Sequence, residues 1–238
     1  MTSTTVLALP EWDLRVLGAF TLLRDGVEVP VGLSGQRLLA YLVTQDRRNS
    51  RAEVAAALWP DAPPDRAGGN LRTALYRIRR AAGCGLLSMR WALALRADLV
   101  VDLRTVTTLA ENVLDGRPCP DAGRLTAARD LLPDLCDDWV LAARDSFALL
   151  RIRALETLCR RLTNDNDRVG AIAAGSAAVL LDPFRESAHR ALMAAHLADQ
   201  DAAAALRLYR DYRRRVRCEL GLRPPADLEA WESTIACC

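Results

Sequence analysis

The first third of the chain alternates short apolar runs with turn residues, and this pattern predicts strands before any helix. Ala19–Leu23 and Val27–Val31 are two such runs, separated by Arg24 and the dipeptide Asp25-Gly26. Asp-Gly favours a two-residue hairpin because both positions of that tight turn need a positive φ. Pro30 suits the end of a strand, where no backbone N–H is required. We therefore predict a β-hairpin over residues 19–31.

Two helices are predicted next, because apolar residues then recur at helical spacing. The first covers residues 36–45, an apolar segment with three leucines. The second begins after Ser50, since Ser50 and Glu53 have the spacing of a capping box. The proline-rich segment 60–64 cannot continue a helix and predicts a loop.

A third helix is predicted over residues 67–82, where Leu71, Leu75 and Ile78 recur with the 3.6-residue period. Two short strands, 86–89 and 91–95, follow it. Hairpin, three helices and a final hairpin are the element order of a winged helix-turn-helix domain.

Helical spacing continues from Val101 to the end of the sequence, without a convincing strand signal. The predicted helices cover residues 103–114, 122–132, 139–163, 167–181, 185–198, 202–220 and 226–235. A shift of 34 residues aligns Leu158 with Leu192 and Asp167 with Asp201, and this period is that of tetratricopeptide-like helix pairs. The predicted fold is therefore an α+β winged helix-turn-helix domain over residues 1–102, followed by an all-α, tetratricopeptide-like domain over residues 103–238.

Composition excludes several classes of protein. Hydrophobic residues make up 51% of the 238 residues and charged residues 26%, which favours a packed core. Met1–Asp13 lacks the pattern of a signal peptide, and the apolar run Ala171–Leu181 is shorter than the ~20 residues of a membrane-spanning helix. The seven cysteines include no C-x-x-C pair, which is typical of a reducing cytoplasm and argues against a zinc site. We expect a cytoplasmic, nucleoid-associated protein without a membrane segment.

Basic residues are distributed unevenly, although the formal net charge is only +2. All 32 of them are arginine, a bias that a GC-rich coding sequence also produces. Seven arginines and no acidic residue lie between Arg66 and Ala97. Arginine suits bidentate contacts to phosphate and guanine, so this segment is a candidate for binding DNA.

The outward face of the third predicted helix is the best candidate for reading bases, because a helix fits the major groove. Free N–H groups at the helix that begins after Ser50 favour a phosphate. The alternative is a solvated helix surface, but the surrounding element order favours DNA. The candidate base-reading residues are Asn70, Arg72, Thr73, Tyr76, Arg77 and Arg80. The candidate phosphate contacts are Arg37, Arg47, Arg48, Ser50, Arg51, Arg79 and Arg90.

Other polar residues give weaker signals. Two histidines, His189 and His196, have no third metal ligand nearby in sequence, and we interpret them as core or surface residues. Asp138 is interpreted as a helix N-cap. Neither a catalytic arrangement nor a phosphate-binding G-x-x-x-x-G-K-[ST] motif occurs, so we expect no enzyme, cofactor or metal. The helix over 202–220 presents a basic face that is either a partner surface or simply solvated, formed by Arg207, Arg210, Arg214 and Arg217.

The sequence resembles a known family across nearly its whole length. Ala57-Leu58-Trp59 and the segment from Asn70 to Arg80 resemble the OmpR-type DNA-binding domain of the SARP family of antibiotic-pathway activators. The second half resembles that family's bacterial transcriptional activation domain in Leu132–Leu135, Asp137–Val140, Leu181–Arg190, Ala205–Tyr209 and Glu219–Pro224.

The resemblance implies an activator that binds direct repeats in double-stranded DNA at promoters of a secondary-metabolite gene cluster. It also implies contact with RNA polymerase and its sigma factor, and self-association on tandem sites. Trp59, Asp61 and Asp65 are the candidate polymerase contacts, because the loop after the second helix is exposed by topology. The turn at Arg90 is shorter than in most relatives, which favours one alternative: a helical interaction scaffold or anti-activator with degenerate DNA binding.

Overall fold

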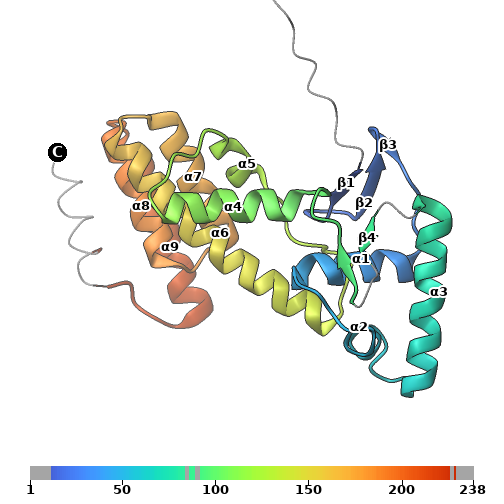
Figure 1. The fold of residues 1–238 in the computed structure, drawn as a ribbon. Helices are drawn as coiled ribbons and strands as arrows, with labels where there is room; N and C mark the ends of the chain where they lie inside the picture. Colours follow the sequence, from blue (N-terminus) through green and yellow to red (C-terminus); the bar gives the residue numbers. More distant parts are fainter. Residues whose placement is uncertain (1–11, 84–85, 89–91, 226–227, 229–238) are drawn as a thin grey trace, which may run out of the picture. The chain divides into compact units, whose positions relative to one another are not determined.

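A computed structural model describes residues 12–83, 86–88, 92–225 and 228 of the chain (Figure 1). The chain divides into two compact units. One contains the described residues up to Val106 together with Arg129–Phe147, and the other contains Thr107–Ala128 and the described residues from Ala148 onward. The boundary therefore crosses the long helix α6 (Asp138–Asn164), whose first part belongs to one unit and whose second part belongs to the other.

The first unit contains a four-stranded sheet with the strand order β3-β2-β1-β6. Its strands are β1 (Trp12–Arg15), β2 (Thr21–Arg24), β3 (Val27–Glu28) and β6 (Val100–Val101). The predicted hairpin is confirmed, since β2 and β3 pair antiparallel around Asp25 and Gly26, whose φ angles are 51° and 80°. β1 and β6 were not predicted, and they pair parallel to each other.

Three helices follow the hairpin: α1 (Leu33–Gln45), α2 (Arg51–Leu58) and α3 (Pro64–Ala82). The helix α1 approaches α3 closely at Gly35, where an added Cβ would lie 2.7 Å from Val31 and 3.2 Å from Ile78. Pro64 was predicted to lie in a loop, but it is the first residue of α3. Proline is tolerated there because its missing N–H has no partner within the first helical turn.

A two-stranded sheet of β4 (Leu87–Ser88) and β5 (Ala94–Leu95) forms the base of the predicted wing. Asn49 anchors it to the chain before α2, because the backbones of Asn49 and Leu93 exchange two hydrogen bonds of 2.9 and 2.8 Å. The amide of Asn49 is fully buried and donates to the carbonyl of Arg47. The turn that contains Arg90 lies outside the described residues.

Helices make up most of the described residues from Asp102 onward, as predicted. They are α4 (Asp102–Leu114), α5 (Ala122–Ala127), α6, α7 (Arg168–Leu181), α8 (Glu186–Ala198) and α9 (Ala202–Leu220). The 34-residue repeat is present in their boundaries, since the ends of α6 and α8 and the starts of α7 and α9 are each 34 residues apart. Apart from Leu228, the predicted helix over 226–235 lies outside the described residues.

The helix predicted over 122–132 ends at Ala127, so its last residues were assigned wrongly. Leu131 forms a bridge with Leu17 beside the sheet, and the N–H of Leu132 donates to the carbonyl of Val16. These pairings place the segment against the first unit, and they outweigh its local helical preference.

Aspartates occupy both helix starts that flank this segment. The half-buried carboxylate of Asp102 accepts from the N–H groups of Val16, Leu17 and Leu103 at the start of α4. At the start of α6, Asp138 was predicted to be the N-cap. It instead lies in the first turn, and the carbonyl of Asp137 accepts the first helical hydrogen bond.

Candidate nucleic-acid interface

The helix α3 has one apolar and one basic face. Six residues of the apolar face are buried against the first unit: Ala67, Leu71, Ala74, Leu75, Ile78 and Ala82. Leucine and isoleucine at this spacing hold the helix in place, because their apolar surface leaves water on packing. The opposite face is therefore fixed in an outward orientation.

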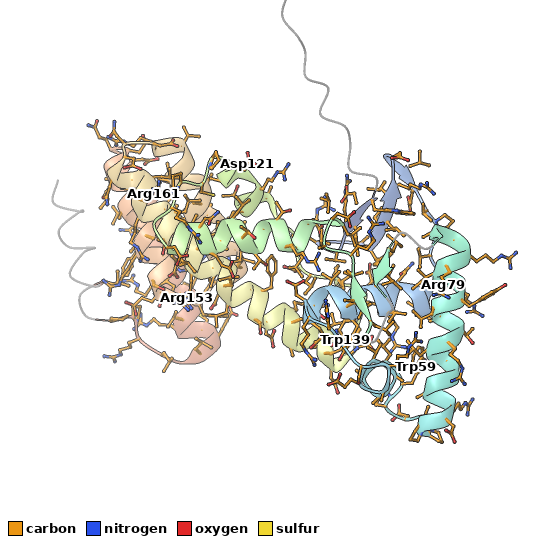
Figure 2. The ribbon with its side chains drawn as sticks, in the orientation of Figure 1. Trp59, Arg79, Asp121, Trp139, Arg153 and Arg161 are labelled. Carbon is orange, nitrogen blue, oxygen red and sulfur yellow. The ribbon has the colours of Figure 1, made fainter. Side chains whose placement is uncertain are left out.

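That outward face carries the predicted base-reading residues. Arg72, Thr73, Tyr76, Arg77 and Arg80 are all exposed, and Tyr76 is 64% exposed despite its aromatic ring. Asn70 is half-buried at the edge of the same face. The sequence prediction of an outward arginine face is thus confirmed as a matter of position. Figure 2 shows side chains that extend from α3, with Arg79 labelled.

Arg72, Arg77 and Arg80 present positive charge on this face. In the described parts of the chain, no carboxylate lies within ion-pairing distance of Arg72, Arg77 or Arg80. The hydroxyl of Thr73 donates to the carbonyl of Gly69, 3.1 Å away, and so bonds back to its own helix. Exposed guanidinium groups without acidic partners keep their donors available to phosphate or guanine.

The start of α2 has the predicted capping box. The hydroxyl of Ser50 accepts from the N–H of Glu53 at 3.1 Å, and the carboxylate of Glu53 accepts from the N–H of Ser50 at 2.8 Å. These hydrogen bonds lower the pKa of Glu53. Glu53 therefore already places a negative charge at this helix start, where a phosphate was expected.

The arginines around that helix start are exposed. Arg47 is 3.8 Å from Glu53, whereas Arg48 and Arg51 have no ion-pair partner among the residues that the structure describes. Arg48 and Arg51 are thus the better-placed candidates of the three for a phosphate contact.

Arg37 was predicted to hold a phosphate, and the structure corrects this. Its guanidinium forms an ion pair with Asp137 and donates to the carbonyl of Leu58, 2.7 Å away. The side chain is only 22% exposed. Arg37 therefore joins α1 to the end of α2 and to the start of α6, and its donors are already used.

Trp139, next to this ion pair, packs its ring edge-on against Tyr41 at a centroid distance of 5.3 Å. Together with Arg37 and Asp137, it fixes the start of α6 on the first unit. Sequence reasoning missed this cluster because about 100 residues separate its partners, and neither half has a distinctive pattern.

The loop after α2 contains the predicted polymerase contacts. Trp59 is half-buried, Asp61 is exposed, and Asp65 is exposed in the first turn of α3. A surface hollow of about 740 Å³ lies beside this loop, lined by Trp59, Asp61, Asn70 and Trp139 among others. The loop is therefore accessible, as its topology predicted.

In the second unit, the basic face of α9 is present but partly paired. Arg207, Arg210, Arg214 and Arg217 are exposed, and Arg214 lies 2.6 Å from Asp211. Beneath this face, Ala205, Tyr209, Tyr212 and Val216 are buried. The face is thus a surface of mixed charge rather than an unbroken basic stripe.

Buried polar residues between helices of the second unit were not predicted. Glu156 is 4% exposed and accepts from Arg185 and Ser187, both at 2.6 Å. Arg151 is also buried and donates to the carbonyls of Leu125 and Thr126. Each charged group is hydrogen-bonded, as burial requires, which favours a structural role.

His189 lies in the core of the second unit, in agreement with the interpretation as a core residue. Its ring stacks at a tilt on Tyr212 with centroids 4.4 Å apart, and Nδ1 lies 3.1 Å from the carbonyl oxygen of Arg185. Burial lowers the pKa of His189 below its usual 6.5.

The described helices include none that is long and apolar enough to cross a membrane.

Comparison with known proteins identifies the chain's family. The model of the bacterial transcriptional activator domain matches residues 97–236, and Regulatory protein AfsR of Streptomyces coelicolor is 33% identical over 240 residues. The chain belongs to the SARP family. Regulatory protein AfsR of Streptomyces griseus is 27% identical over 236 residues. Each alignment covers 92% of this SARP-family chain but only 24% of AfsR, so the chain spans about a quarter of these relatives.

A solved structure shares the fold of this SARP-family chain. EmbR of Mycobacterium tuberculosis, in complex with a low-affinity phosphopeptide, matches it with a TM-score of 0.68 at 24% identity. The match covers 95% of this chain and 65% of the EmbR chain. It confirms the predicted fold class, a small α+β domain followed by a helical one.

Proposed function

We propose that this SARP-family chain is a sequence-specific DNA-binding transcriptional activator. The observation that carries the proposal is the outward face of α3, where Arg72, Arg77 and Arg80 are exposed and have no acidic partner among the described residues. A helix in the major groove reads guanine through bidentate arginine contacts. The buried face of α3 holds these side chains on a rigid element, as readout requires.

Phosphate contacts surround this face in the proposed complex. Arg48 and Arg51 near the start of α2, and Arg79 on α3, hold the DNA backbone, with weaker contributions from Arg47 and Ser50. Arg90 is a further proposed contact in the wing. Such contacts set the orientation of the protein on the duplex without reading sequence.

The proposed binding sites are direct repeats at promoters of a secondary-metabolite gene cluster. Protomers then lie side by side on one face of the duplex. Trp59, Asp61 and Asp65 meet RNA polymerase and its sigma factor, and the arginine face of α9 meets a neighbouring protomer or polymerase. Family membership and resemblance to AfsR support these assignments. We further propose that the protein acts at the nucleoid in the cytoplasm.

In-vitro selection from random duplex DNA tests the proposal most directly. The full chain is used at ~0.15 M salt, where non-specific binding is weak. We expect enriched words repeated head to tail about one helical turn apart. Inverted repeats would keep DNA binding but exclude the tandem arrangement. Absence of any enrichment would exclude sequence-specific binding and leave the scaffold or anti-activator alternative.

A further inference from the structure

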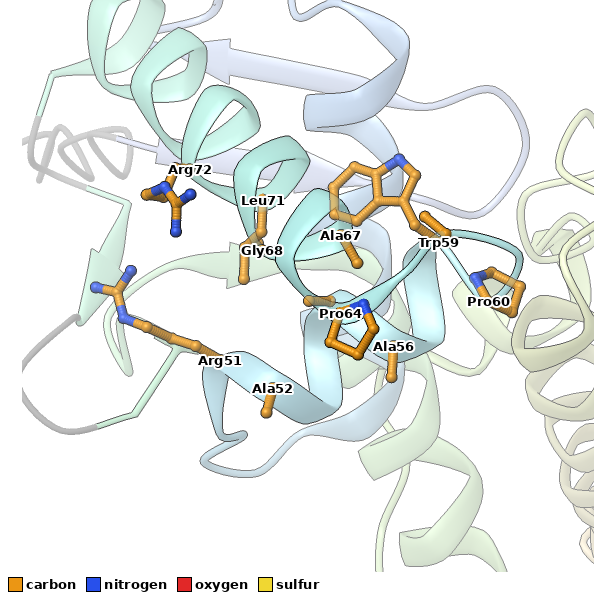
Figure 3. Close-up of a pocket in the computed structure, with 12 residues that line it drawn as sticks. Arg51, Ala52, Ala56, Trp59, Pro60, Pro64, Ala67, Gly68, Leu71 and Arg72 are labelled. Carbon is orange, nitrogen blue, oxygen red and sulfur yellow. The ribbon is translucent and has the colours of Figure 1, made fainter.

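An apolar groove between α2 and α3 is lined almost entirely by small and apolar residues. Its volume is about 750 Å³, within the range of about 300–1,000 Å³ that is usual for small-molecule sites. Ala52 and Ala56 of α2 form one wall, and Ala67 and Leu71 of α3 form the other. Trp59 and Pro60 lie at one end (Figure 3).

The other end of the groove carries two arginines, Arg51 and Arg72. Figure 3 shows their guanidinium groups reaching toward each other from the two helices. Neither has an ion pair or hydrogen bond among the residues that the structure describes. The groove is therefore apolar along its length and ends at two positive charges that are unpaired within the described parts of the chain.

We propose that this groove binds a small amphipathic anion, with its apolar body between α2 and α3 and its carboxylate at Arg51 and Arg72. Two guanidiniums recognise a carboxylate by charge-assisted, bidentate hydrogen bonds. Apolar area between the alanines and Trp59 stabilises the body of the ligand by its removal from water. The site does not depend on the proposed function.

Competition with DNA is the regulatory consequence, and this part rests on the proposed function. Arg72 belongs to the base-reading face and Arg51 to the phosphate contacts. A bound carboxylate occupies both guanidiniums and adds negative charge where DNA approaches. The ligand therefore weakens binding to the operator without displacing α3.

Isothermal titration calorimetry of the full chain with decanoate tests the site in the absence of DNA. Decan-1-ol is the neutral match, and we expect it to bind at least about tenfold more weakly because it lacks the charge. We expect Arg51→Gln and Arg72→Gln each to weaken decanoate binding about tenfold. The control is Arg66→Gln, which replaces an exposed arginine of α3 outside the groove and leaves decanoate binding unchanged.

Filling the groove gives a second, charge-independent test. Ala56→Phe adds an aromatic ring from an exposed position on α2 and is expected to abolish decanoate binding. Ala203→Phe, at an exposed position of α9, is the matched control and leaves it intact. Circular dichroism checks that both variants are folded.

Three outcomes overturn the site: no heat of binding up to about a millimolar, equal binding of decanoate and decan-1-ol, or full binding to Ala56→Phe. Binding that survives in Ala203→Phe but not in Ala56→Phe supports it. Decanoate added to the selected DNA complex should raise the Kd for DNA in the wild type but not in Ala56→Phe. An unchanged Kd overturns the competition alone, and failed DNA selection with intact decanoate binding overturns only the proposed function.

Discussion

At the scale of single residues, arginines of this protein differ in what surrounds them. Arg77 projects from the C-terminal half of α3 without an acidic partner in the described parts of the chain, whereas Arg37 is half-buried and paired with Asp137. The same side chain therefore has two consequences when it is removed. Under the proposed function, we expect loss of Arg77 to change DNA binding, whereas we expect loss of Arg37 to change the stability of the fold.

Arg77→Ala is expected to lower specific DNA affinity by about 1–3 kcal/mol and to relax preference at one base position. Arg48→Ala is the comparison, since loss of a phosphate contact weakens binding to all DNA sequences alike and flattens the salt dependence of binding by about one unit of slope. Binding to the selected operator and to single-base variants, measured across salt concentrations, separates the two. Unchanged base preference in Arg77→Ala would show that Arg77 does not contact a base.

Arg37→Ala is expected to destabilise the first unit by about 1–3 kcal/mol, because it leaves Asp137 and the carbonyl of Leu58 without their donor. The double variant with Asp137→Ala should cost less than the sum of the two single changes. Arg15→Ala is the control, because the Arg15 side chain that pairs with Asp13 is itself exposed, and it should change stability by less than about 0.5 kcal/mol. Urea unfolding measures all four variants, and strict additivity would show that the pair does not interact.

His189 gives the second unit a dependence on pH. Burial lowers its pKa in the folded state, so the unfolded chain binds a proton first as the pH falls below about 6.5. The stability from neutral His189 is present above that pH and is lost as the pH falls through the folded-state pKa. His189→Gln should therefore lose less stability than the wild type between pH 7.5 and pH 5.5 in urea unfolding. An equal loss in both proteins would assign the dependence to other groups.

At the scale of elements, the two helix pairs of the second unit each contain the same kind of turn. Asn166 and Gln200 both have positive φ, at 66° and 63°. Each precedes an aspartate that caps the next helix: Asp167 accepts from the N–H of Gly170, and Asp201 accepts from that of Ala204. The repeat is thus a repeated turn as well as a repeated helix length.

Asp167→Ala and Asp201→Ala should each destabilise the protein by about 1 kcal/mol, because each removes an N-cap acceptor. Asp199→Ala, at the other side of the second turn, removes no capping bond and should stay within about 0.5 kcal/mol of the wild type. Thermal and urea unfolding compare the three. A cost confined to one of the two caps would show that the repeats are not energetically equivalent.

Most helices follow from sequence because their signals are local. The capping box at Ser50 and the spacing of Leu71, Leu75 and Ile78 each specify an element without reference to distant residues. The outward arginine face of α3 follows from the same spacing. The predictable part of the site is therefore the part that lies on one helix.

The elements that sequence did not predict depend on distant partners. The strand β1 (Trp12–Arg15) has only four residues, and β6 has two, so neither carries a long pattern. Leu131 and Leu132 end the expected helix because they pair with Leu17 and Val16, more than 100 residues earlier. Pairings of this range are decided by tertiary structure, which overrides local propensity.

At the scale of the whole molecule, α6 links the two compact units by an unbroken backbone. Its start is held in the first unit by Trp139 and Asp137, and its second half is buried in the second unit at Ile152, Leu155 and Cys159. A helix transmits order along its length because each residue bonds four positions back. We therefore expect the units to unfold together.

Leu149→Pro tests this coupling at an exposed position just past the boundary between the units. Proline removes one helical hydrogen bond and clashes with the preceding turn, at a cost of about 3 kcal/mol. Because that cost falls on the linking backbone and on neither core, the single unfolding transition of the wild type should split into two. Leu149→Ala, which keeps the helix, should retain one transition. Differential scanning calorimetry distinguishes the cases, since two-state unfolding requires equal calorimetric and van't Hoff enthalpies. Two transitions already present in the wild type would show that α6 does not couple the units.

DNA binding by Leu149→Pro should persist at the temperature where the first unit is folded, because α3 and its arginine face lie wholly within that unit.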